Sequence, residues 1–256
     1  MPTYYKGHVR RPDKDHLIAL SHARHKDHLR QLGAIPQPSS WDSRTMNLVG
    51  PVKDQGQCGS CWDFSGTGII EIAFNKAGIG GGPNAFILSE EYTLSCYRNG
   101  GCNGDDNTTV LEWAKSNGLP LTAAYGPYAA APAQCAYNAS MTLYEPDDWG
   151  FADSAGGTGV TPTADIKAAI MQYGAVGCGI AADDSVQAYT GGVFTGSGAT
   201  EIDHDIILVG WDDATGSWIL RNSWSASWGE GGYMRIAYGA NNVGSESVWT
   251  VKHSGS

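Results

Sequence analysis

The pattern of apolar residues changes after about residue 175 of this 256-residue chain, and this change constrains the fold more than any other feature. Before it, apolar residues recur at helical spacing between Gly stops, and we expect helices over 13–32, 61–77, 107–117 and 163–173, with another beginning at Ser89. After it, runs rich in Val, Ile, Trp and Tyr alternate with Gly, Asp and Ser turns, and we expect strands over 175–180, 205–211, 217–222, 233–238 and 247–252. This order predicts an α+β fold with two lobes and a cleft between them.

The chain divides into three expected segments. Residues 1–37 form an N-terminal arm, residues 38–145 a mainly helical lobe and residues 146–256 a mainly β lobe. Pro36 and Pro38 predict an extended linker between the arm and the body. The expected arm helix would contact the body through its leucines, Leu17, Leu20, Leu29 and Leu32.

Charge is distributed unevenly between the arm and the rest of the chain. Residues 1–37 carry seven Lys and Arg against three Asp and Glu, a net charge of +4, whereas residues 38–256 carry nine against 23, a net charge of −14. An acidic body repels polyanions, so we expect no nucleic-acid partner. No run of about 18 apolar residues occurs, so we expect no membrane span. The basic arm is suited to lie against the acidic body.

Six cysteines allow disulfides, and two of them form a Cys-X-X-Cys motif at Cys58 and Cys61. The number and spacing of the cysteines do not decide what this motif is. It can be a redox pair, half of a zinc site, or one bridge cysteine beside one free thiol. No second motif with zinc spacing exists, so we expect no metal site. The polar turn 53–57 before the motif argues against a thioredoxin-like strand at that place.

Cys61 has the local setting of a nucleophile. It lies where a polar turn meets the helix expected over 61–77, and the unpaired N–H groups and partial positive charge of a helix N-terminus lower a thiol pKa. A thiolate nucleophile needs a base, and His204 stands far downstream, where a loop enters an expected strand. Asn222, the last residue of the next expected strand, can orient that base. Each residue alone is more often structural, but together they indicate nucleophilic catalysis.

Five motifs then resemble one family, the papain-like (cathepsin-type) cysteine peptidases. The run from Gln55 to Trp62 has the Cys-Gly-Ser-Cys-Trp signature around the nucleophile, with His and Asn at the expected distance downstream. The other matching stretches are 95–96 with 101–104, 203–210, 222–224 and 228–233. The resemblance covers about residues 39–253. It implies the papain-like two-lobe fold, with the nucleophile helix in the helical lobe and His and Asn in a β-barrel-like lobe.

The resemblance assigns roles residue by residue. Cys61 attacks the peptide carbonyl, His204 pairs with it and protonates the leaving amine, and Asn222 orients the imidazole. Gln55 donates its side-chain N–H to the oxyanion, and Trp224 covers the contact between His and Asn from water. No cofactor is implied.

The resemblance also sorts the cysteines. It implies the bridges Cys58–Cys102 and Cys96–Cys135, and it leaves Cys178, in an apolar run, as a buried free thiol. Each bridge adds roughly 2–4 kcal/mol of stability. Disulfides indicate an oxidising compartment, either outside the cell, in a periplasm or in a lysosome-like lumen.

Three residues depart from the family's usual pattern. Asp63 stands where relatives usually have Ala, and we expect it to cap the helix or to lie on its outer face. Asp105 follows Gly104 where a second Gly is common, and Asp205 follows the catalytic His where a small residue is usual. The substrate-binding residues that the resemblance implies are Gly104, Asp105, Asp205 and Trp224.

By resemblance, Asp105 and Asp205 line the pocket for the second residue upstream of the cut bond. Two carboxylates in that pocket favour Lys or Arg and disfavour bulky apolar side chains. The alternative is that Asp205 turns to solvent or pairs with a neighbouring residue.

The sequence is therefore interpreted as a cysteine endopeptidase that hydrolyses peptide bonds through a thioester intermediate. The stretch between Cys102 and Cys135 is short, so no long insertion blocks the cleft. Two alternatives stay open: an inactive relative that serves as a binding module, and an acyltransferase or amidase with the same Cys–His pair. We expect a monomer whose partners are proteins or peptides. By position and charge, residues 1–37 resemble the end of an inhibitory prosegment, and the simpler alternative is an extension without function.

Overall fold

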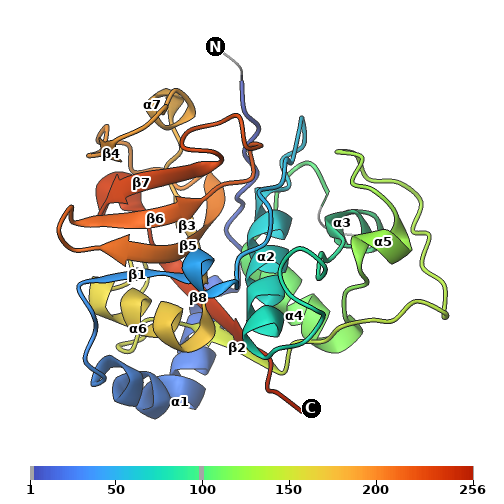
Figure 1. The fold of residues 1–256 in the computed structure, drawn as a ribbon, viewed down its shortest axis with the longest axis horizontal. Helices are drawn as coiled ribbons and strands as arrows, with labels where there is room; N and C mark the ends of the chain where they lie inside the picture. Colours follow the sequence, from blue (N-terminus) through green and yellow to red (C-terminus); the bar gives the residue numbers. More distant parts are fainter. Residues whose placement is uncertain (1–2, 98–100, 256) are drawn as a thin grey trace.

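The computed structural model describes residues 3–97 and 101–255. The sheet and some of the helices lie on one side of the molecule, and the other helices lie on the other side (Figure 1). The helices are α1 (Lys14–Gly33), α2 (Cys61–Lys76), α3 (Glu90–Cys96), α4 (Asn107–Asn117), α5 (Thr122–Tyr125), α6 (Thr163–Tyr173) and α7 (Asp184–Gln187), with 3-10 turns η1 (Ser43–Met46) and η2 (Ala240–Asn242). The strands are β1 (Ser40–Asp42), β2 (Asp148–Phe151), β3 (Val176–Ile180), β4 (Val193–Phe194), β5 (His204–Asp212), β6 (Ser217–Arg221), β7 (Tyr233–Ala237) and β8 (Ser245–Val251). Every helix and strand expected from the sequence is present.

One sheet organises the second half of the chain. Its strand order is β2-β8-β3-β5-β6-β7-β4, and β1 pairs separately with β5. All pairs are antiparallel except the short parallel pair of β4 with β7. The pairing of β1 brings Ser40–Asp42 to the sheet, although we expected residues 38–145 to belong to the helical lobe. Strands β1, β2 and β4 escaped prediction because each is too short for an alternating pattern to show.

Strand β5 separates two hydrophobic cores. Ile206 and Leu208 face a core that α6, β3 and β6 also line, whereas Ile207 and Val209 face a core built around α2 and α4. Because successive side chains on a strand point to opposite faces, a strand buried on both faces is apolar throughout. The same strand begins at His204, so the packing of the two cores also fixes the position of that residue.

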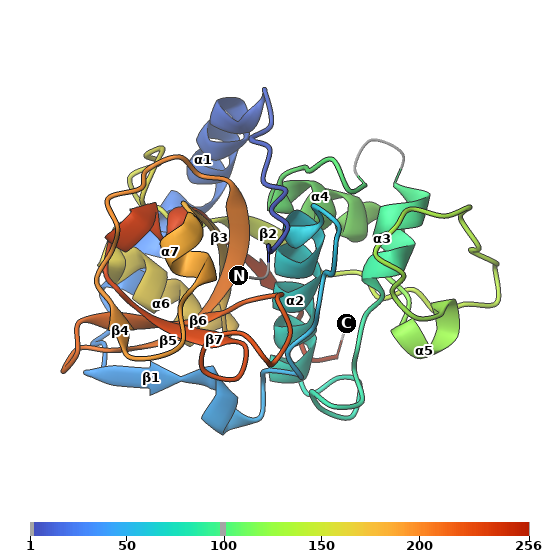
Figure 2. The same cartoon turned by 90° about the horizontal axis from the view of Figure 1, so that it is seen from above.

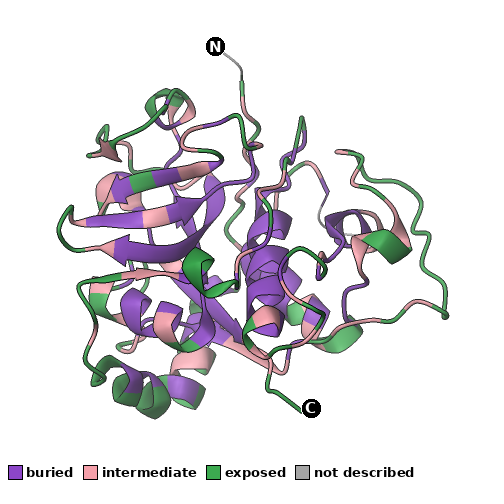
Figure 3. Ribbon diagram, in the orientation of Figure 1, coloured by how far each residue is buried: buried purple, intermediate pink, exposed green. Residues whose placement is uncertain are grey.

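Helix α2 is the buried centre of the helical side (Figure 3). All but its last two residues are buried. A Cβ at Gly66 would lie 2.6 Å from the Cβ of Val110 in α4, and a Cβ at Gly68 would lie 2.5 Å from Cδ1 of Ile207 in β5. Glycine weakens a helix, and the close approach of α4 and β5 explains why both glycines are nevertheless present.

The arm crosses the molecule between the two sides before it forms α1 (Figure 2). Its first described residues lie between the sheet and α2, and α1 then packs against α6 and β2. Leu29 and Leu32 are buried, together with Ile18. Leu20 is 54% exposed, so the expectation that it contacts the body is wrong. A step of two positions along a helix, as from Ile18 to Leu20, turns the second side chain to the opposite face.

Candidate active site

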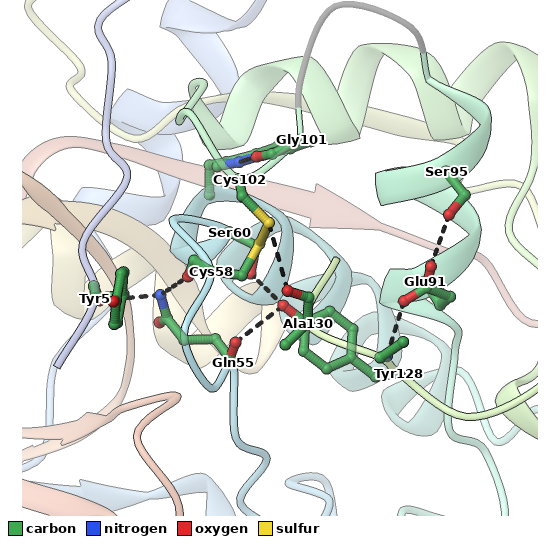
Figure 4. The surroundings of a disulfide bond; sticks show 12 residues. Tyr5, Gln55, Cys58, Ser60, Glu91, Ser95, Gly101, Cys102, Tyr128 and Ala130 are labelled. Carbon is green, nitrogen blue, oxygen red and sulfur yellow. Dashed lines mark hydrogen bonds between the residues drawn. A yellow bond between two sulfur atoms is a disulfide. The ribbon is translucent and has the colours of Figure 1, made fainter. Parts of the chain in front are cut away.

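Cys61 is the first residue of α2, and a disulfide directly precedes it (Figure 4). The structure forms both bridges that the resemblance implies, Cys58–Cys102 and Cys96–Cys135. Among the described cysteines, Cys61 and Cys178 remain as buried free thiols. The first bridge ties the turn before α2 to the loop before α4. It therefore fixes the direction in which the N-terminus of α2 points.

His204 at the start of β5 faces Asn222, which directly follows β6. Nε2 of His204 lies 2.8 Å from Oδ1 of Asn222, so Nε2–H donates to the amide oxygen. Nδ1 of His204 is buried and has no hydrogen-bond partner in the described part of the chain. Trp224 stacks on the imidazole with a ring-centroid distance of 4.5 Å. The ring is thus held in one orientation with its second nitrogen free.

The backbone N–H groups of Gly7, Trp62 and Asp205 each lower the pKa of the Cys61 thiol. The N–H of Gly7 donates to Sγ at 3.2 Å. Because Asp205 is the next residue after His204, this effect indicates that Cys61 and His204 lie close together.

Gln55 directs its side-chain amide at a main-chain carbonyl of the arm (Figure 4). Nε2 of Gln55 donates to the carbonyl oxygens of Tyr5 at 3.0 Å and Cys58 at 2.8 Å. Its Oε1 accepts from the hydroxyl of Ser223 at 2.6 Å, which fixes the amide orientation. The indole N–H of Trp224 donates to the same Tyr5 oxygen at 3.2 Å. The Tyr5 carbonyl oxygen is therefore held by two side-chain donors, Gln55 and Trp224.

Burial shifts the pKa values of Cys61 and His204 in opposite directions. Burial raises the pKa of the Cys61 thiol and the Asp205 carboxylate raises it further, against the lowering effect of the three N–H groups. Burial lowers the pKa of His204 to about 4, although its hydrogen bond with Asn222 acts in the opposite direction. Both shifts favour the uncharged form of each group, because both side chains are buried away from water.

Residues 3–11 of the arm, called the cleft segment below, bind both sides of the cleft through their main chain. The N–H of His8 donates to the Asp203 carbonyl on the sheet side at 3.2 Å. The N–H of Val9 donates to the Asp105 carbonyl on the helical side at 2.9 Å. These contacts do not depend on the side chains of the cleft segment.

Gly104 allows the cleft segment to approach this closely. The Asp105 N–H donates to the Gly7 carbonyl at 3.0 Å. Gly104 has φ +98°, and a Cβ there would lie 2.7 Å from the Gly7 oxygen. The main chain of Gly104 and Asp105 is therefore shaped to receive an extended peptide.

A cavity of about 200 Å³, called the Asp205 cavity below, lies beside His8. Nδ1 of His8 lies 3.0 Å from Oδ2 of Asp205. The other oxygen of Asp205 and Oδ1 of Asn107 are buried and lack hydrogen-bond partners in residues 3–97 and 101–255. Glu246 also lines the cavity. The Asp205 cavity thus offers acceptors that still lack donors.

The side chain of Asp105 turns away from the Asp205 cavity, contrary to expectation. It accepts from the Asp106 N–H at 2.7 Å and from the Thr109 hydroxyl at 2.8 Å, because these unpaired donors lie at the first turn of α4. Sequence reasoning missed Asn107 and Glu246. Nothing in the sequence indicates which loop side chains point into a cavity, although the position of Asn107 close to Asp105 was a weak signal.

Two further arm cations neutralise carboxylates near the Asp205 cavity. Nζ of Lys14 lies 2.5 and 2.7 Å from the two oxygens of Asp106, and both side chains are buried. Arg10 donates from Nε to Glu246 at 2.8 Å. Asp106 and Glu246 of the body therefore have cationic partners that come from the arm.

Asp63 neither caps α2 nor lies on its outer face, so both expectations are wrong. The residue is fully buried, and its Oδ1 accepts from the Thr67 hydroxyl at 2.9 Å. Burial raises the pKa of Asp63 well above its usual range, and the charge of Glu90 raises it further. The Asp63 carboxyl does not act on the Cys61 sulfur as the Asp205 carboxylate does.

Two structural features are absent from residues 3–97 and 101–255. No three His, Cys, Asp or Glu side chains converge as metal ligands do. No helix combines the length and the apolar character that crossing a bilayer requires.

Comparison with known proteins identifies the family. The model of the papain family cysteine proteases matches residues 37–252. Digestive cysteine proteinase 1 of Homarus americanus is 35% identical over 221 residues, which cover 82% of this chain and 65% of that protein. Cathepsin L of Sarcophaga peregrina is 36% identical over 218 residues, which cover 81% of this chain and 61% of that protein. The chain thus spans slightly less than two thirds of the length of these relatives.

Solved structures agree with the sequence comparison. The Carica candamarcensis cysteine protease CMS1MS2, in complex with E-64, has a TM-score of 0.71 and 31% identity over 84% of this chain and 99% of that chain. The bromelain protease from Ananas comosus, in complex with the E64 inhibitor, has a TM-score of 0.72 and 27% identity over the same shares. The papain-like α+β fold is confirmed. The chain belongs to the papain family of cysteine proteases.

Proposed function

We propose that the chain is a cysteine endopeptidase that cleaves peptide bonds through a thioester intermediate. One observation carries this proposal. A free thiol at a helix N-terminus, an imidazole with one free nitrogen and a side-chain amide that holds a main-chain carbonyl all lie along the same extended segment. These groups belong to Cys61, His204 and Gln55. Membership of the papain family supports the same chemistry.

The residues divide the reaction between them. Nδ1 of His204 takes the thiol proton of Cys61, and the thiolate attacks the peptide carbonyl carbon. Gln55 and the N–H of Cys61 stabilise the oxyanion, and losing one such donor lowers the rate by about 10²–10³. His204 then protonates the leaving amine, which leaves a thioester. Water attacks the thioester, His204 takes a proton from that water, and the acid leaves as the thiol is restored.

Replacing each free thiol in turn tests this function. For the assay, a protease site is inserted in the linker 34–37 of the full chain. The linker is then cleaved and the arm is removed. The remaining protein is called the cut chain below. Cys61→Ser should lower peptide hydrolysis by about 10³ or more, because a hydroxyl is a far weaker nucleophile. Cys178→Ser is the matched control, since Cys178 is buried in β3, and should stay active. Undiminished hydrolysis by Cys61→Ser would refute the proposal.

Two other activities predict different results in the same assay. Since E-64 is bound in both related structures, it serves as a probe of the cut chain. Peptide hydrolysis that E-64 blocks supports the endopeptidase. Binding of E-64 without peptide hydrolysis favours an acyltransferase or amidase, and absence of both favours a binding module.

We further propose that the arm is an inhibitory prosegment and that its reversed direction protects it from cleavage. In a substrate, by resemblance, the residue in the Asp205 cavity precedes the residue whose carbonyl lies at Gln55. In the arm the order is opposite, because His8 lies beside the Asp205 cavity and Tyr5 presents its carbonyl to Gln55. The Gly7 N–H, rather than a carbonyl carbon, lies against the Cys61 sulfur.

Release of the arm tests the inhibition. From Pro38 onward the chain is fixed to the body, since the Trp211 indole N–H donates to the Pro38 carbonyl at 3.2 Å. Cleavage in linker 34–37 should therefore leave the body intact and raise the rate of peptide hydrolysis. Equal rates for the intact and the cut chain would contradict the prosegment and favour an extension without function.

The Asp205 cavity supports a preference for a basic residue at the second position upstream of the cut bond. A guanidinium or ammonium group supplies the donors that Asp205 and Asn107 lack, and Glu246 adds a second negative charge. Cleavage of a peptide library by the cut chain tests this preference. A clear preference for Leu or Phe at that position would contradict it.

The two disulfides support a site of action in an oxidising compartment, either secreted, periplasmic or lysosome-like. We propose that the chain acts there as a monomer. Gel filtration of the full chain tests this state, and a dimer at assay concentration would contradict it.

A further inference from the structure

A second acidic pocket, called the Asp203 pocket below, already holds a lysine side chain of the arm. Nζ of Lys6 donates to the Ala182 carbonyl at 2.9 Å and forms a short ion pair with Oδ2 of Asp203. Oδ1 of Asp203 accepts from the Ala182 N–H at 2.8 Å, which fixes the carboxylate. Asp203 therefore presents one oxygen, next to a carbonyl oxygen, to a cation.

The surroundings of the Asp203 pocket are acidic as well. Asp183, Asp184 and Glu201 line the same open hollow of about 580 Å³. Lys6 is the only cation among the lining residues of this hollow in the described part of the chain. When the arm is removed, no cationic side chain of the body remains among the lining residues of this hollow in the described part of the chain.

The Asp203 pocket and the Asp205 cavity lie on opposite sides of the nucleophile. Lys6 and His8 flank Gly7, whose N–H lies on the Cys61 sulfur, and the two hollows share no lining residue. Tyr4, on the Lys6 side of Gly7, stacks on Trp224 at 4.7 Å. Trp224 in turn covers His204, which protonates the leaving amine, so the Asp203 pocket lies on the leaving-group side.

We propose that the Asp203 pocket selects a Lys or Arg side chain on the leaving-group side of the cut bond. This inference rests on the proposed endopeptidase activity. Together with the Asp205 cavity, it defines the substrate class as extended peptides with basic residues on both sides of the cut bond. Lys6 shows the chemistry of recognition, a charge-assisted hydrogen bond to a carboxylate beside a carbonyl acceptor.

Paired peptides measure the preference in the cut chain. Each pair is identical except for Lys or Gln at the first or the second position after the cut bond. We expect kcat/KM to be about tenfold higher for Lys at one of these positions. Asp203→Asn keeps the acceptor for the Ala182 N–H and removes the charge, so the ratio of Lys to Gln should fall to near one. Glu145→Gln, an exposed charge outside the hollow's lining, is the matched control and should keep the ratio.

A binding measurement decides the inference even if the chain hydrolyses no peptide. A synthetic peptide of residues 3–11 is titrated into the cut chain by calorimetry. Lys6→Gln in the peptide should weaken its binding to the cut chain about tenfold. The same change should hardly alter binding to the Asp203→Asn variant of the cut chain. Failure to hydrolyse any peptide would refute the proposed function, whereas this double-mutant cycle still tests the pocket. Equal rates for Lys and Gln in an active enzyme, a preference that survives Asp203→Asn, or the absence of coupling would overturn the inference.

Discussion

The cleft segment and α1 belong to the same arm, yet they bind the body in different ways. The cleft segment uses main-chain hydrogen bonds and ion pairs, such as those of Gly7 and Lys6. Helix α1 uses apolar and aromatic packing: Leu29 and Leu32 are buried in the core of the sheet side, and His25 meets Trp249 edge to face at 4.9 Å. The part that lies against Cys61 is therefore not the part that contributes most apolar burial.

This difference suggests a division of labour within the arm. Main-chain contacts accept many sequences, so the cleft segment can be displaced by a substrate that makes the same contacts. Apolar burial by α1 does not compete with substrate, and it keeps the cleft segment at a high local concentration. Substitutions in the two halves should consequently have separable effects on stability and on activity.

The junction between the halves should give the largest effect. Lys14 and Asp106 form a buried ion pair, and Lys14→Met leaves the carboxylate without its partner, at a cost of about 3–5 kcal/mol. We expect a lower midpoint in urea unfolding and a higher basal peptidase rate, because detachment of the arm lets water reach Asp106. Lys26→Met, at an exposed position of α1, is the control. An equal loss of stability in both variants would show that the pair does not join the arm to the body.

A substitution in α1 should weaken the anchor without opening the cleft. Leu29→Ala removes a buried side chain from the core, which costs about 2–4 kcal/mol. We expect faster dissociation of the arm after cleavage of the linker, measured by gel filtration, and little change in the basal rate of the intact chain. A basal rate as high as that of the cut chain would show that α1, rather than the cleft segment, carries the inhibition.

A substitution in the cleft segment should have the opposite profile. A Cβ at Gly7 would lie 1.9 Å from the Gly59 carbonyl oxygen, so Gly7→Leu cannot occupy the cleft without displacing it, at a cost of about 1–3 kcal/mol. We expect the basal peptidase rate of the intact chain to rise about tenfold to a hundredfold. Gly33→Ala is the matched control, since its Cβ would lie 3.8 Å from Oδ1 of Asp165. An unchanged basal peptidase rate in Gly7→Leu would show that the cleft segment does not inhibit the enzyme.

A lower pH should strengthen the contact of the cleft segment with the body and weaken that of α1. This effect should be the smallest of the four. Burial lowers the pKa of His8, but the charge and hydrogen bond of Asp205 prevail and raise it above 6.5, with Asp106 and Lys14 also nearby. Its contact is therefore fully present below pH 6.5 and is lost as the pH rises through the raised pKa. Burial lowers the pKa of His25, against the charge of Asp148 and together with those of Arg24, His28 and Lys115, so its contribution is lost as the pH falls through the lowered pKa.

Peptide binding measures the acid effect on the cleft segment alone. From pH 7.5 to 5.5, binding of the 3–11 peptide to the cut chain should tighten, by less than about tenfold, the change that one pKa unit gives. His8→Gln should abolish the difference. In the intact chain, the pH at which half of the arm has detached from the body gives the response of α1. In the His25→Gln variant this midpoint should lie at a lower pH. Parallel responses of both halves would contradict the comparison.

Local sequence signals predicted much of the fold and part of the site. The helix from Cys61, the helices over 107–117 and 163–173 and the long β5 all carry patterns that depend on residues close in sequence. The structure also forms the two bridges and brings the Gln55, His204 and Asn222 side chains to the cleft segment or to one another. Short strands such as β4 and the path of the arm left no such local signal.

The sequence alone determined the family, a cysteine at a helix N-terminus, and an acidic body with a basic arm, because all three depend on residue types and their spacing. Only the tertiary structure decided which carboxylates share a pocket. Asp205 and Glu246 lie on different strands and Asn107 begins a helix, so their convergence depends on how β5, β8 and α4 pack. A loop side chain such as that of Asp105 takes the direction in which it finds donors, and Asp63 lies buried beside Thr67 in the packed helix α2. The number of charged residues in a sequence does not show where their side chains point, and those orientations determine what a cleft can bind.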